Sequence, residues 1–372
     1  MRRKEFLVIG SINLDVMAEF HPEDKKIIDK VGKVKYSIGG TAYNIAHNIA
    51  KHGFKVLLVS FLREGSFITQ HVLEKLKRNK VSTDFIEIDK EINESSFVSH
   101  NCKGELISAV SSTSINHGRL NYEKISEGIK SSSMVIMDCN MDPHQINKIL
   151  EISEGFRVPI AISGVSEEKA VKIKNLEISD AFPLAIMSMN KKEFEALGMP
   201  LNGQICQKLK TSYLIITNGM NGFEVWSTKK ESSIIVPPVN VKNFKSSSGS
   251  GDALLASLCI KFVESGDLIM DEKVMNSING DLEQILALEY PTDDAELTDF
   301  KELKDKQKTQ EKGKFVEFIK TLSEVVTAIG TIWIVILTLV AVLIGYFALD
   351  HDGSIKLKSF ISEILPKKLT RQ

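Results

Sequence analysis

Length, composition and charge set the first limits on this chain. Its 372 residues, 43% hydrophobic and 26% charged, are enough for one large globular domain or two smaller ones. The formal net charge of -1, from 47 basic and 48 acidic residues, argues against a nucleic-acid-binding protein. The four cysteines lie far apart and include no Cys-x-x-Cys pair, so the sequence indicates reduced thiols rather than a disulfide framework or a zinc site.

Short apolar runs alternate with amphipathic segments through residues 1–295. The apolar runs predict strands at residues 6–10, 55–60, 133–138, 158–163, 184–189 and 213–218, and a further pair at residues 222–227 and 233–238. Apolar residues at helical spacing predict helices over residues 41–53, 68–79, 144–153 and 190–197. This alternation predicts an α/β domain with a mostly parallel central sheet flanked by helices.

Two segments, residues 19–38 and 95–111, do not fit the alternation. Both predict extra strands that project from the central sheet as a small β lid. Projections near a site in such folds often close over a ligand, so we expect this lid to border the binding site.

Polar residues and glycines gather where the predicted strands end or the predicted helices begin. They are Asn13, Asp15, Gly39, Gly40, Asn44, Asn190, Glu193, Thr217, Gly219 and Gly222. Ligands of open α/β sheets bind outside the carboxyl ends of the strands, so this shared position indicates a binding site. Each group also has a purely structural explanation, because glycines form turns, asparagines cap helices and acidic residues begin them.

A serine- and glycine-rich turn directly precedes an apolar helical pattern over residues 254–262. Its last residues, Gly249, Ser250 and Gly251, have little side-chain bulk, so the backbone can approach a ligand closely. Backbone N–H groups and the macrodipole at a helix N-terminus attract anions, and a phosphate would fit. The alternative is an ordinary N-cap loop, in which Ser or Asp side chains satisfy the first amides.

The sequence changes character after residue 295. Residues 296–324 are highly charged and predict a solvated linker. Residues 325–349 contain no charged residue and are long enough to cross a hydrocarbon core of ~30 Å. We expect a transmembrane helix there, the alternative being a buried core helix. The short basic tail, residues 350–372, is partly amphipathic, which predicts a helix on the membrane surface or a partner-binding helix.

The order of these motifs resembles that of the ribokinase (PfkB-type) family of carbohydrate and nucleoside kinases, over about residues 5–265. The first family signature is similar to SIGGTAYNIAHNIAKHG, and the second to SSSGSGDALLASL. The Asn-x-x-Glu element resembles NKKE, and the Thr-x-Gly-x-x-Gly nucleotide loop resembles TNGMNG. Within the family, the pseudouridine kinases are most similar to the stretches MVIMDCNM and VPIAISGVSEEKAVKIK. The resemblance implies a ribokinase-like fold over residues 1–295.

The resemblance also implies an ATP-dependent transfer of phosphate to a hydroxyl group of a sugar or a nucleoside. Asp252 would be the general base, and the amides of Gly249, Ser250 and Gly251 would form an anion hole. The other implied roles are sugar binding by Asn13, Asp15, Gly39, Gly40 and Asn44, phosphate contact by Asn140, water-mediated Mg²⁺ binding by Asn190 and Glu193, and nucleotide binding by Thr217, Gly219 and Gly222. The family resemblance further allows a monovalent cation and a homodimer. The kinase domain would face the cytoplasm, where ATP is, and the chain would cross the membrane once.

Departures from the family pattern leave a second interpretation open. Ser250 stands where the family usually has alanine, and Arg63, Glu64 and Gly65 replace the usual Gly-Asp pair after the second strand. The sequence after residue 265 lacks the alanine-rich helices that normally close the adenine pocket. The alternative is a membrane-tethered pseudokinase, which binds a sugar or nucleoside as a sensor or scaffold. The retained Asp252 favours the enzyme.

Overall fold

The computed structural model describes residues 5–20, 30–102, 105–238 and 249–268. All of them belong to the first of two units into which the chain divides, Met1–Phe300 and Lys301–Gln372. The predicted linker, transmembrane helix and tail lie outside the described residues. Within the described ranges, no helix is long and apolar enough to cross a membrane.

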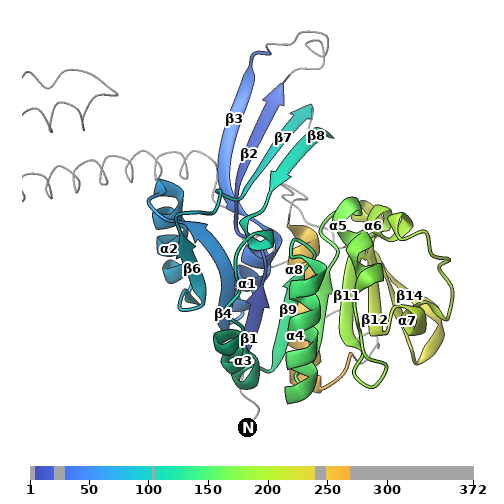
Figure 1. Ribbon diagram of the computed structural model, residues 1–372. Coiled ribbons are helices and arrows are strands. Elements are labelled where there is room, and N and C mark those ends of the chain that lie inside the picture. Colours follow the sequence, from blue (N-terminus) through green and yellow to red (C-terminus); the bar gives the residue numbers. More distant parts are fainter. Residues whose placement is uncertain (1–4, 21–29, 103–104, 239–248, 269–372) are drawn as a thin grey trace, which may run out of the picture. The chain divides into compact units, whose positions relative to one another are not determined.

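A ten-stranded sheet forms the middle layer of the first unit (Figure 1). Its strands follow the order β14-β13-β12-β11-β10-β9-β1-β4-β5, and β6 pairs with β4. Neighbours from β12 to β5 pair in parallel, whereas β13 and β14 add two antiparallel strands at one edge. The bounds are β1 (Glu5–Ile9), β4 (Lys55–Arg63), β5 (Val81–Ser82), β6 (Ile86–Asp89), β9 (Met134–Asp138), β10 (Ile160–Ser163), β11 (Leu184–Asn190), β12 (Thr211–Thr217), β13 (Phe223–Ser227) and β14 (Lys230–Val236). The predicted mostly parallel α/β sheet is therefore confirmed.

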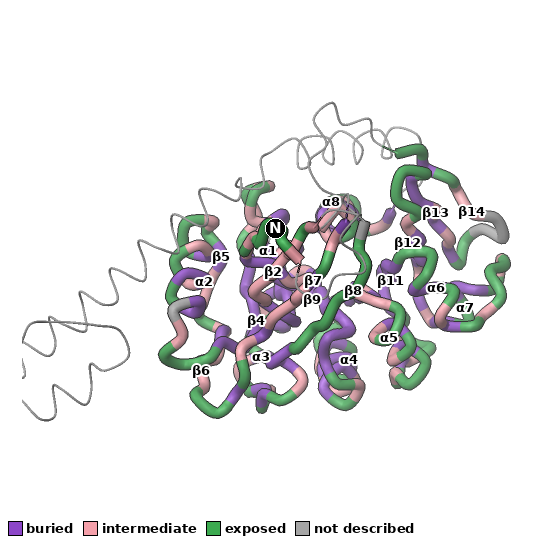
Figure 2. The backbone as a smooth tube through the Cα atoms, turned by 90° about the horizontal axis from the view of Figure 1, so that it is seen from above, coloured by how far each residue is buried: buried purple, intermediate pink, exposed green. Residues whose placement is uncertain are grey.

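Helices cover both faces of this sheet, which explains why its central strands are continuous apolar runs. In β1, Phe6 and Val8 pack on one face, while Leu7 and Ile9 pack on the other. The first face is covered by α1 (Thr41–Lys51), α2 (Phe67–Arg78) and α8 (Ser250–Ser265). The second face is covered by α3 (Tyr122–Ser131), α4 (Pro143–Phe156), α6 (Lys191–Ala196) and α7 (Ile205–Lys208). Figure 2 shows the buried backbone of the sheet between the exposed outer sides of the helices.

A separate four-stranded sheet stands at the end of the unit where the central strands finish (Figure 1). Its order is β3-β2-β7-β8, from β2 (Asn13–Phe20), β3 (Gly32–Gly39), β7 (Ser96–Cys102) and β8 (Glu105–Ser112). The two segments that did not fit the alternation therefore form strands of their own sheet, as predicted. β2 begins only a few residues after β1 ends, so Asn13 and Asp15 belong to this projecting sheet.

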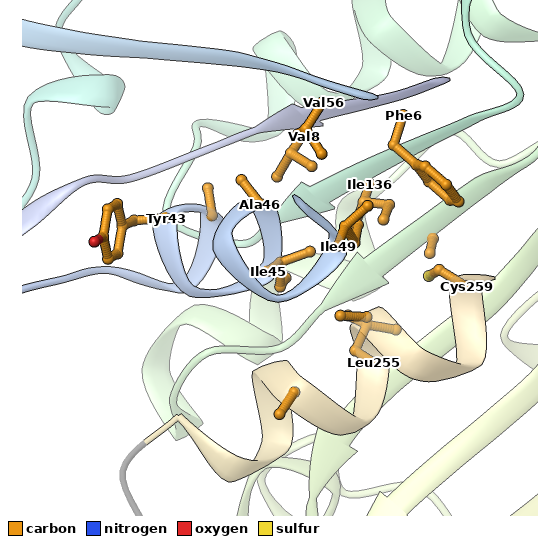
Figure 3. Close-up of a cluster of buried hydrophobic side chains, with 14 of the residues drawn as sticks. Phe6, Val8, Tyr43, Ile45, Ala46, Ile49, Val56, Ile136, Leu255 and Cys259 are labelled. Atoms are coloured by element: carbon orange, nitrogen blue, oxygen red, sulfur yellow. The ribbon is translucent and has the colours of Figure 1, made fainter. Parts of the chain in front are cut away.

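Helix α1 lies between the central sheet and α8. In Figure 3, Ile45 and Ile49 of α1 point toward Leu255 of α8, while Val8 and Val56 of the sheet lie on the opposite side of α1. All these side chains are buried in one apolar cluster. This packing holds the first turns of α1 and α8 together, although they are far apart in the sequence.

Sequence reasoning missed α3, α7, β5, β6 and the short helix α5 (Glu167–Ala170). α3 buries only Ile125, Gly128 and Ile129, an apolar stripe too short to stand out from the surrounding polar residues. β5 has two residues and exists because Val81 and Ser82 pair with β4. Short elements of this kind depend on the tertiary contact rather than on local periodicity.

Candidate active site

The predicted site residues lie along the end of the sheet where the central strands finish. From β1 the chain continues to β4 on one side, whereas β9, the other neighbour of β1, continues to β10 on the opposite side. Such a reversal opens a crevice at the carboxyl ends of the strands, the usual ligand position in open α/β sheets. β2 carries Asn13 and Asp15, β11 ends at Asn190, and β12 ends at Thr217. The strand order therefore places these residues at the carboxyl end of the central sheet.

Asp252 lies in the first turn of α8 and is partly buried as a residue. Nδ2 of Asn44, on α1, donates a hydrogen bond to Oδ2 of Asp252 over 2.8 Å. Burial raises the pKa of Asp252 to about 7, against the lowering effect of the bond from Asn44. The negative charges of Asp138, Glu193 and Asp15 add to the rise. A carboxylate with such a pKa can take a proton from a hydroxyl group near neutral pH.

The N-terminus of α8 begins at a glycine in the left-handed conformation. Gly249 has φ 78°, and this N-cap residue makes no side-chain hydrogen bond to the first amides. A Cβ atom on Gly251 would meet no atom of the described residues within 4 Å, so the space beside this turn is open. The open space beside Gly249, Ser250 and Gly251 is compatible with the predicted anion site at this helix N-terminus.

Gly39 and Gly40 allow the backbone to pass close to the residues that follow β1. A Cβ atom on Gly39 would lie 2.1 Å from Oδ2 of Asp15, and one on Gly40 would lie 2.4 Å from the carbonyl oxygen of Ser11. Gly40 also has φ 101°, which other residues rarely adopt. Oδ1 of Asn13 is buried, and the described residues offer it no hydrogen-bond partner. A ligand hydroxyl would satisfy this oxygen, so the arrangement fits a sugar-binding role.

A hydrogen-bond network that sequence reasoning missed lies at the same end of the sheet. Asp138, which ends β9, accepts bonds from the backbone amides of Ser11 over 3.0 Å and of Asn140 over 2.9 Å. Nδ2 of Asn140 donates to Oγ of Ser11 over 2.8 Å. Oδ1 of Asn140 accepts a bond from Nζ of Lys169 over 2.6 Å. Burial raises the pKa of Asp138, an effect that the two amides oppose.

Gly10 makes room for this network, because a Cβ atom there would lie 2.1 Å from Oδ2 of Asp138. One signal could have revealed the network from the sequence. Asp138 is an acidic residue at the end of an apolar run, the position that favours a ligand site in such sheets. Of the network residues, sequence reasoning identified only Asn140.

Asn190 and Glu193 form the capping box of α6. The N–H of Glu193 donates to Oδ1 of Asn190, and the N–H of Asn190 donates to Oε2 of Glu193, each over 2.9 Å. Burial raises the pKa of Glu193, and the hydrogen bond from the backbone of Asn190 opposes this rise. The box has a structural role, and it also fits a Mg²⁺ ion held through water, because a buried carboxylate suits a hydrated hard cation. The described residues contain no group of three or more His, Cys, Asp or Glu that could hold a metal directly.

Thr217 ends β12, and the loop after it turns tightly through η4 (Gly219–Asn221). The N–H of Asn218 donates to the carbonyl oxygen of Gly222 over 2.8 Å. Gly222 has φ 81°, and a Cβ atom there would lie 2.1 Å from the carbonyl oxygen of Val236, so a glycine is needed. β9, β10 and β11 separate β12 from β1. The predicted nucleotide residues and the predicted sugar residues therefore lie at different parts of the carboxyl end of the sheet. α8 packs against β10 and β11, the strands between them.

Comparisons with known proteins identify the family to which this chain belongs. A family model described as pfkB family carbohydrate kinase matches residues 3–287. The chain is 28% identical over 279 residues to the pseudouridine kinase of Escherichia coli (strain K12), a match that covers 71% of this chain and 86% of that protein.

Solved structures of kinases have the same fold. The ribokinase of Arabidopsis thaliana complexed with ribose and ATP has a TM-score of 0.61 at 17% identity, over 77% of this chain and 94% of that chain. The nucleoside kinase of Burkholderia thailandensis in complex with inosine has a TM-score of 0.55 at 15% identity, over 76% of this chain and 90% of that chain. The family model spans most of this sequence, and the chain therefore belongs to the pfkB family of carbohydrate kinases.

Proposed function

We propose that this protein is an ATP-dependent kinase that phosphorylates a hydroxyl group of a sugar or a nucleoside, with Asp252 as the general base. The observation that carries the proposal is the environment of Asp252. Its carboxyl group lies at the N-terminus of α8, accepts a bond from Asn44, and has a pKa of about 7. A proton acceptor thus lies beside the open, glycine-rich helix N-terminus, which suits a phosphate group.

In the proposed reaction, Asp252 takes the proton from the acceptor hydroxyl as its oxygen bonds to the γ-phosphorus of ATP. The bond between that phosphorus and the bridging oxygen breaks, and ADP leaves with the electron pair. The amides of Gly249, Ser250 and Gly251 stabilise the negative charge on the transferring group. The bond from Asn44 favours the ionised form of Asp252 and keeps its carboxyl group oriented.

The remaining residues divide between the two substrates. Asp15 and Asn13, whose Oδ1 has no partner among the described residues, would hold acceptor hydroxyls, because both lie beside the turn at Gly39. Mg²⁺, which neutralises charge on the phosphates of ATP, would be held through water by Asn190 and Glu193. The loop after Thr217 would line the nucleotide.

Pseudouridine is the first acceptor to test. The support is the 28% identity to a pseudouridine kinase, which extends over 86% of that protein. The nucleoside and sugar kinases of the same fold make other nucleosides and free sugars the next candidates.

We also propose that residues 325–349 anchor the kinase to a membrane, with the catalytic domain on the cytoplasmic side. The support is the uncharged, apolar sequence of this segment and the need for ATP. A cysteine introduced at Gln372 should react with a membrane-impermeant thiol reagent in intact cells. Protection of that cysteine until the cells are lysed would contradict a single crossing.

The direct test of the enzymatic function is ADP release by the full chain in detergent, with Mg²⁺-ATP and a panel of pseudouridine, uridine, inosine, ribose and fructose. We expect turnover with at least one acceptor, and its loss in the Asp252→Asn variant. Binding of ATP and an acceptor with no turnover would instead support the pseudokinase. That outcome remains the second candidate because Ser250 and the sequence after residue 265 depart from the family pattern.

A further inference from the structure

Lys169 occupies a position between the two halves of the candidate site. It lies in α5 (Glu167–Ala170), the short helix that follows β10. β10 has β9, which ends at Asp138, on one side and β11, which ends at Asn190, on the other. The predicted acceptor residues lie beyond β9 and the predicted nucleotide residues lie on β11 and β12. A residue that follows β10 therefore lies between the predicted nucleotide residues and the predicted acceptor residues, on the path that a transferred phosphoryl group would take.

The turn before α5 has an unusual backbone that sets the direction of this helix. The N–H of Ser166 donates to the carbonyl oxygen of Gly164 over 2.9 Å, which closes a three-residue turn around Val165. Val165 has φ 72°, a conformation that is costly for a β-branched residue. Strained residues of this kind persist where the surrounding structure requires them, and they cluster at functional sites. Here the turn directs the chain so that Lys169 faces the loop after β9.

The surroundings of the Lys169 ammonium suit an anion. Its Nζ lies 2.6 Å from Oδ1 of Asn140, a neutral acceptor that is itself bonded to Ser11. No carboxylate oxygen of the described residues lies within 4.0 Å of this Nζ. An ammonium group has three N–H donors and can form more than this one bond. Lys169 is half-buried, and Asn140 is the hydrogen-bond partner that its ammonium has among the described residues, so phosphate oxygens could accept its remaining N–H donors.

Lys169 and Asp252 both respond to the charge of Asp138. The charge of Asp138 raises the pKa of Asp252 and also raises the pKa of Lys169, so both groups lie within the field of the same carboxylate. Burial has the larger effect on Lys169 and lowers its pKa. Lys172, the next lysine along the chain, instead donates to the carbonyl oxygens of Cys139 and Met141 and holds the loop after β9.

We propose that Lys169 binds the γ-phosphoryl group of ATP during its transfer, held in position by Asn140. This inference rests on the proposed kinase function. The acceptor oxygen forms a bond to the γ-phosphorus, the bond to the β,γ-bridging oxygen breaks, and the hydroxyl proton goes to Asp252. The ammonium group of Lys169 neither gains nor loses a proton. It donates hydrogen bonds to the γ-phosphate oxygens and offsets their charge.

The test is a calorimetric titration of the full chain with two nucleotides in the presence of Mg²⁺. One is ADP, which lacks the γ-phosphate, and the other is AMP-PNP, which carries a γ-phosphate that is not transferred. The variants are Lys169→Met, which removes the charge, and Lys169→Gln, whose amide still donates to Asn140. Lys174→Met is the matched control, because Lys174 is an exposed lysine five residues further along.

We expect both Lys169 variants to bind AMP-PNP ~10- to 100-fold more weakly, the range for a lost hydrogen bond to a charged group. Their affinity for ADP should be unchanged, and Lys174→Met should match the original protein with both nucleotides. Lys169→Gln decides the outcome if Lys169→Met fails to fold.

Two results would overturn the inference. The first is that the original protein binds both nucleotides and Lys169→Gln either keeps the original affinity for AMP-PNP or loses affinity for ADP and AMP-PNP equally. Lys169 then does not hold the γ-phosphate, and the proposed kinase function stands. If the original protein binds neither nucleotide, the proposed function fails together with this inference.

Discussion

Replacing Asp252 with asparagine should lower turnover sharply and, at alkaline pH, stabilise the folded protein. The loss of activity follows from the loss of the proton acceptor, which should lower kcat by ~10²-fold or more. The gain in stability follows from the raised pKa. Burial moves the pKa of this carboxyl group from 3.8 to about 7. Between these values the unfolded chain ionises the group while the folded chain keeps it protonated, so folding becomes less favourable as the pH rises.

The magnitude has an upper limit set by the two pKa values. At ~1.4 kcal/mol for each pH unit, the difference between 3.8 and about 7 corresponds to about 4 kcal/mol above pH 7. Asp252 as a residue is only partly buried, and partial contact with solvent weakens the effect of burial, so we expect ~1–2 kcal/mol at pH 8. The asparagine keeps the contact with Asn44, because its side-chain oxygen can accept the same hydrogen bond.

Thermal unfolding at pH 5 and pH 8, together with ADP release, measures both effects. The midpoint of the Asp252→Asn variant should exceed that of the original protein by a few degrees at pH 8, and by less at pH 5, because most of the cost is absent there. kcat/KM of the original protein should rise with pH through about 7, as the base ionises. An equal difference in midpoint at the two pH values would refute the pKa reasoning, and full activity of the variant would refute the role of the base.

Three further substitutions test neighbouring features. Asn44→Ala removes a bond that favours the ionised Asp252, so the pKa should rise further and the pH–rate profile should move to higher pH; an unmoved profile would contradict this. Gly39→Ala would place a Cβ atom 2.1 Å from Oδ2 of Asp15. Displacing this carboxylate should raise KM for the acceptor ~10-fold or more and leave KM for ATP unchanged, and equal changes in both would count against the assignment of Asp15. Tyr213→Phe removes the hydroxyl that bonds to Asp267 over 2.6 Å at the end of α8, so the unfolding free energy should fall by ~1 kcal/mol with activity retained. An unchanged unfolding midpoint would show that this bond is dispensable.

Local pattern was sufficient to predict much of the fold. The six apolar runs became β1, β4, β9, β10, β11 and β12, and the pair after them became β13 and β14. The parallel strands in the middle of the sheet are readable because nearly all their residues are buried on both faces and apolar. β13 is readable by its alternation of buried and half-buried residues instead. The helices at residues 41–53 and 68–79 were predictable because one face of each packs on the sheet. The positions of the glycine turns and of the polar residues at strand ends also followed from the sequence.

Only the tertiary structure determined which of these residues contact one another and how the contacts change their pKa values. Asn44 and Asp252 are 208 positions apart, and their hydrogen bond exists because α1 packs against α8. The same packing buries Asp252 near other carboxylates and so raises its pKa, which no local pattern encodes. The contact of Lys169 with Asn140 likewise depends on β9 and β10 being neighbours. Amino-acid spacing determines which face of an element is buried, whereas the distance between two elements is set only when all of them pack together.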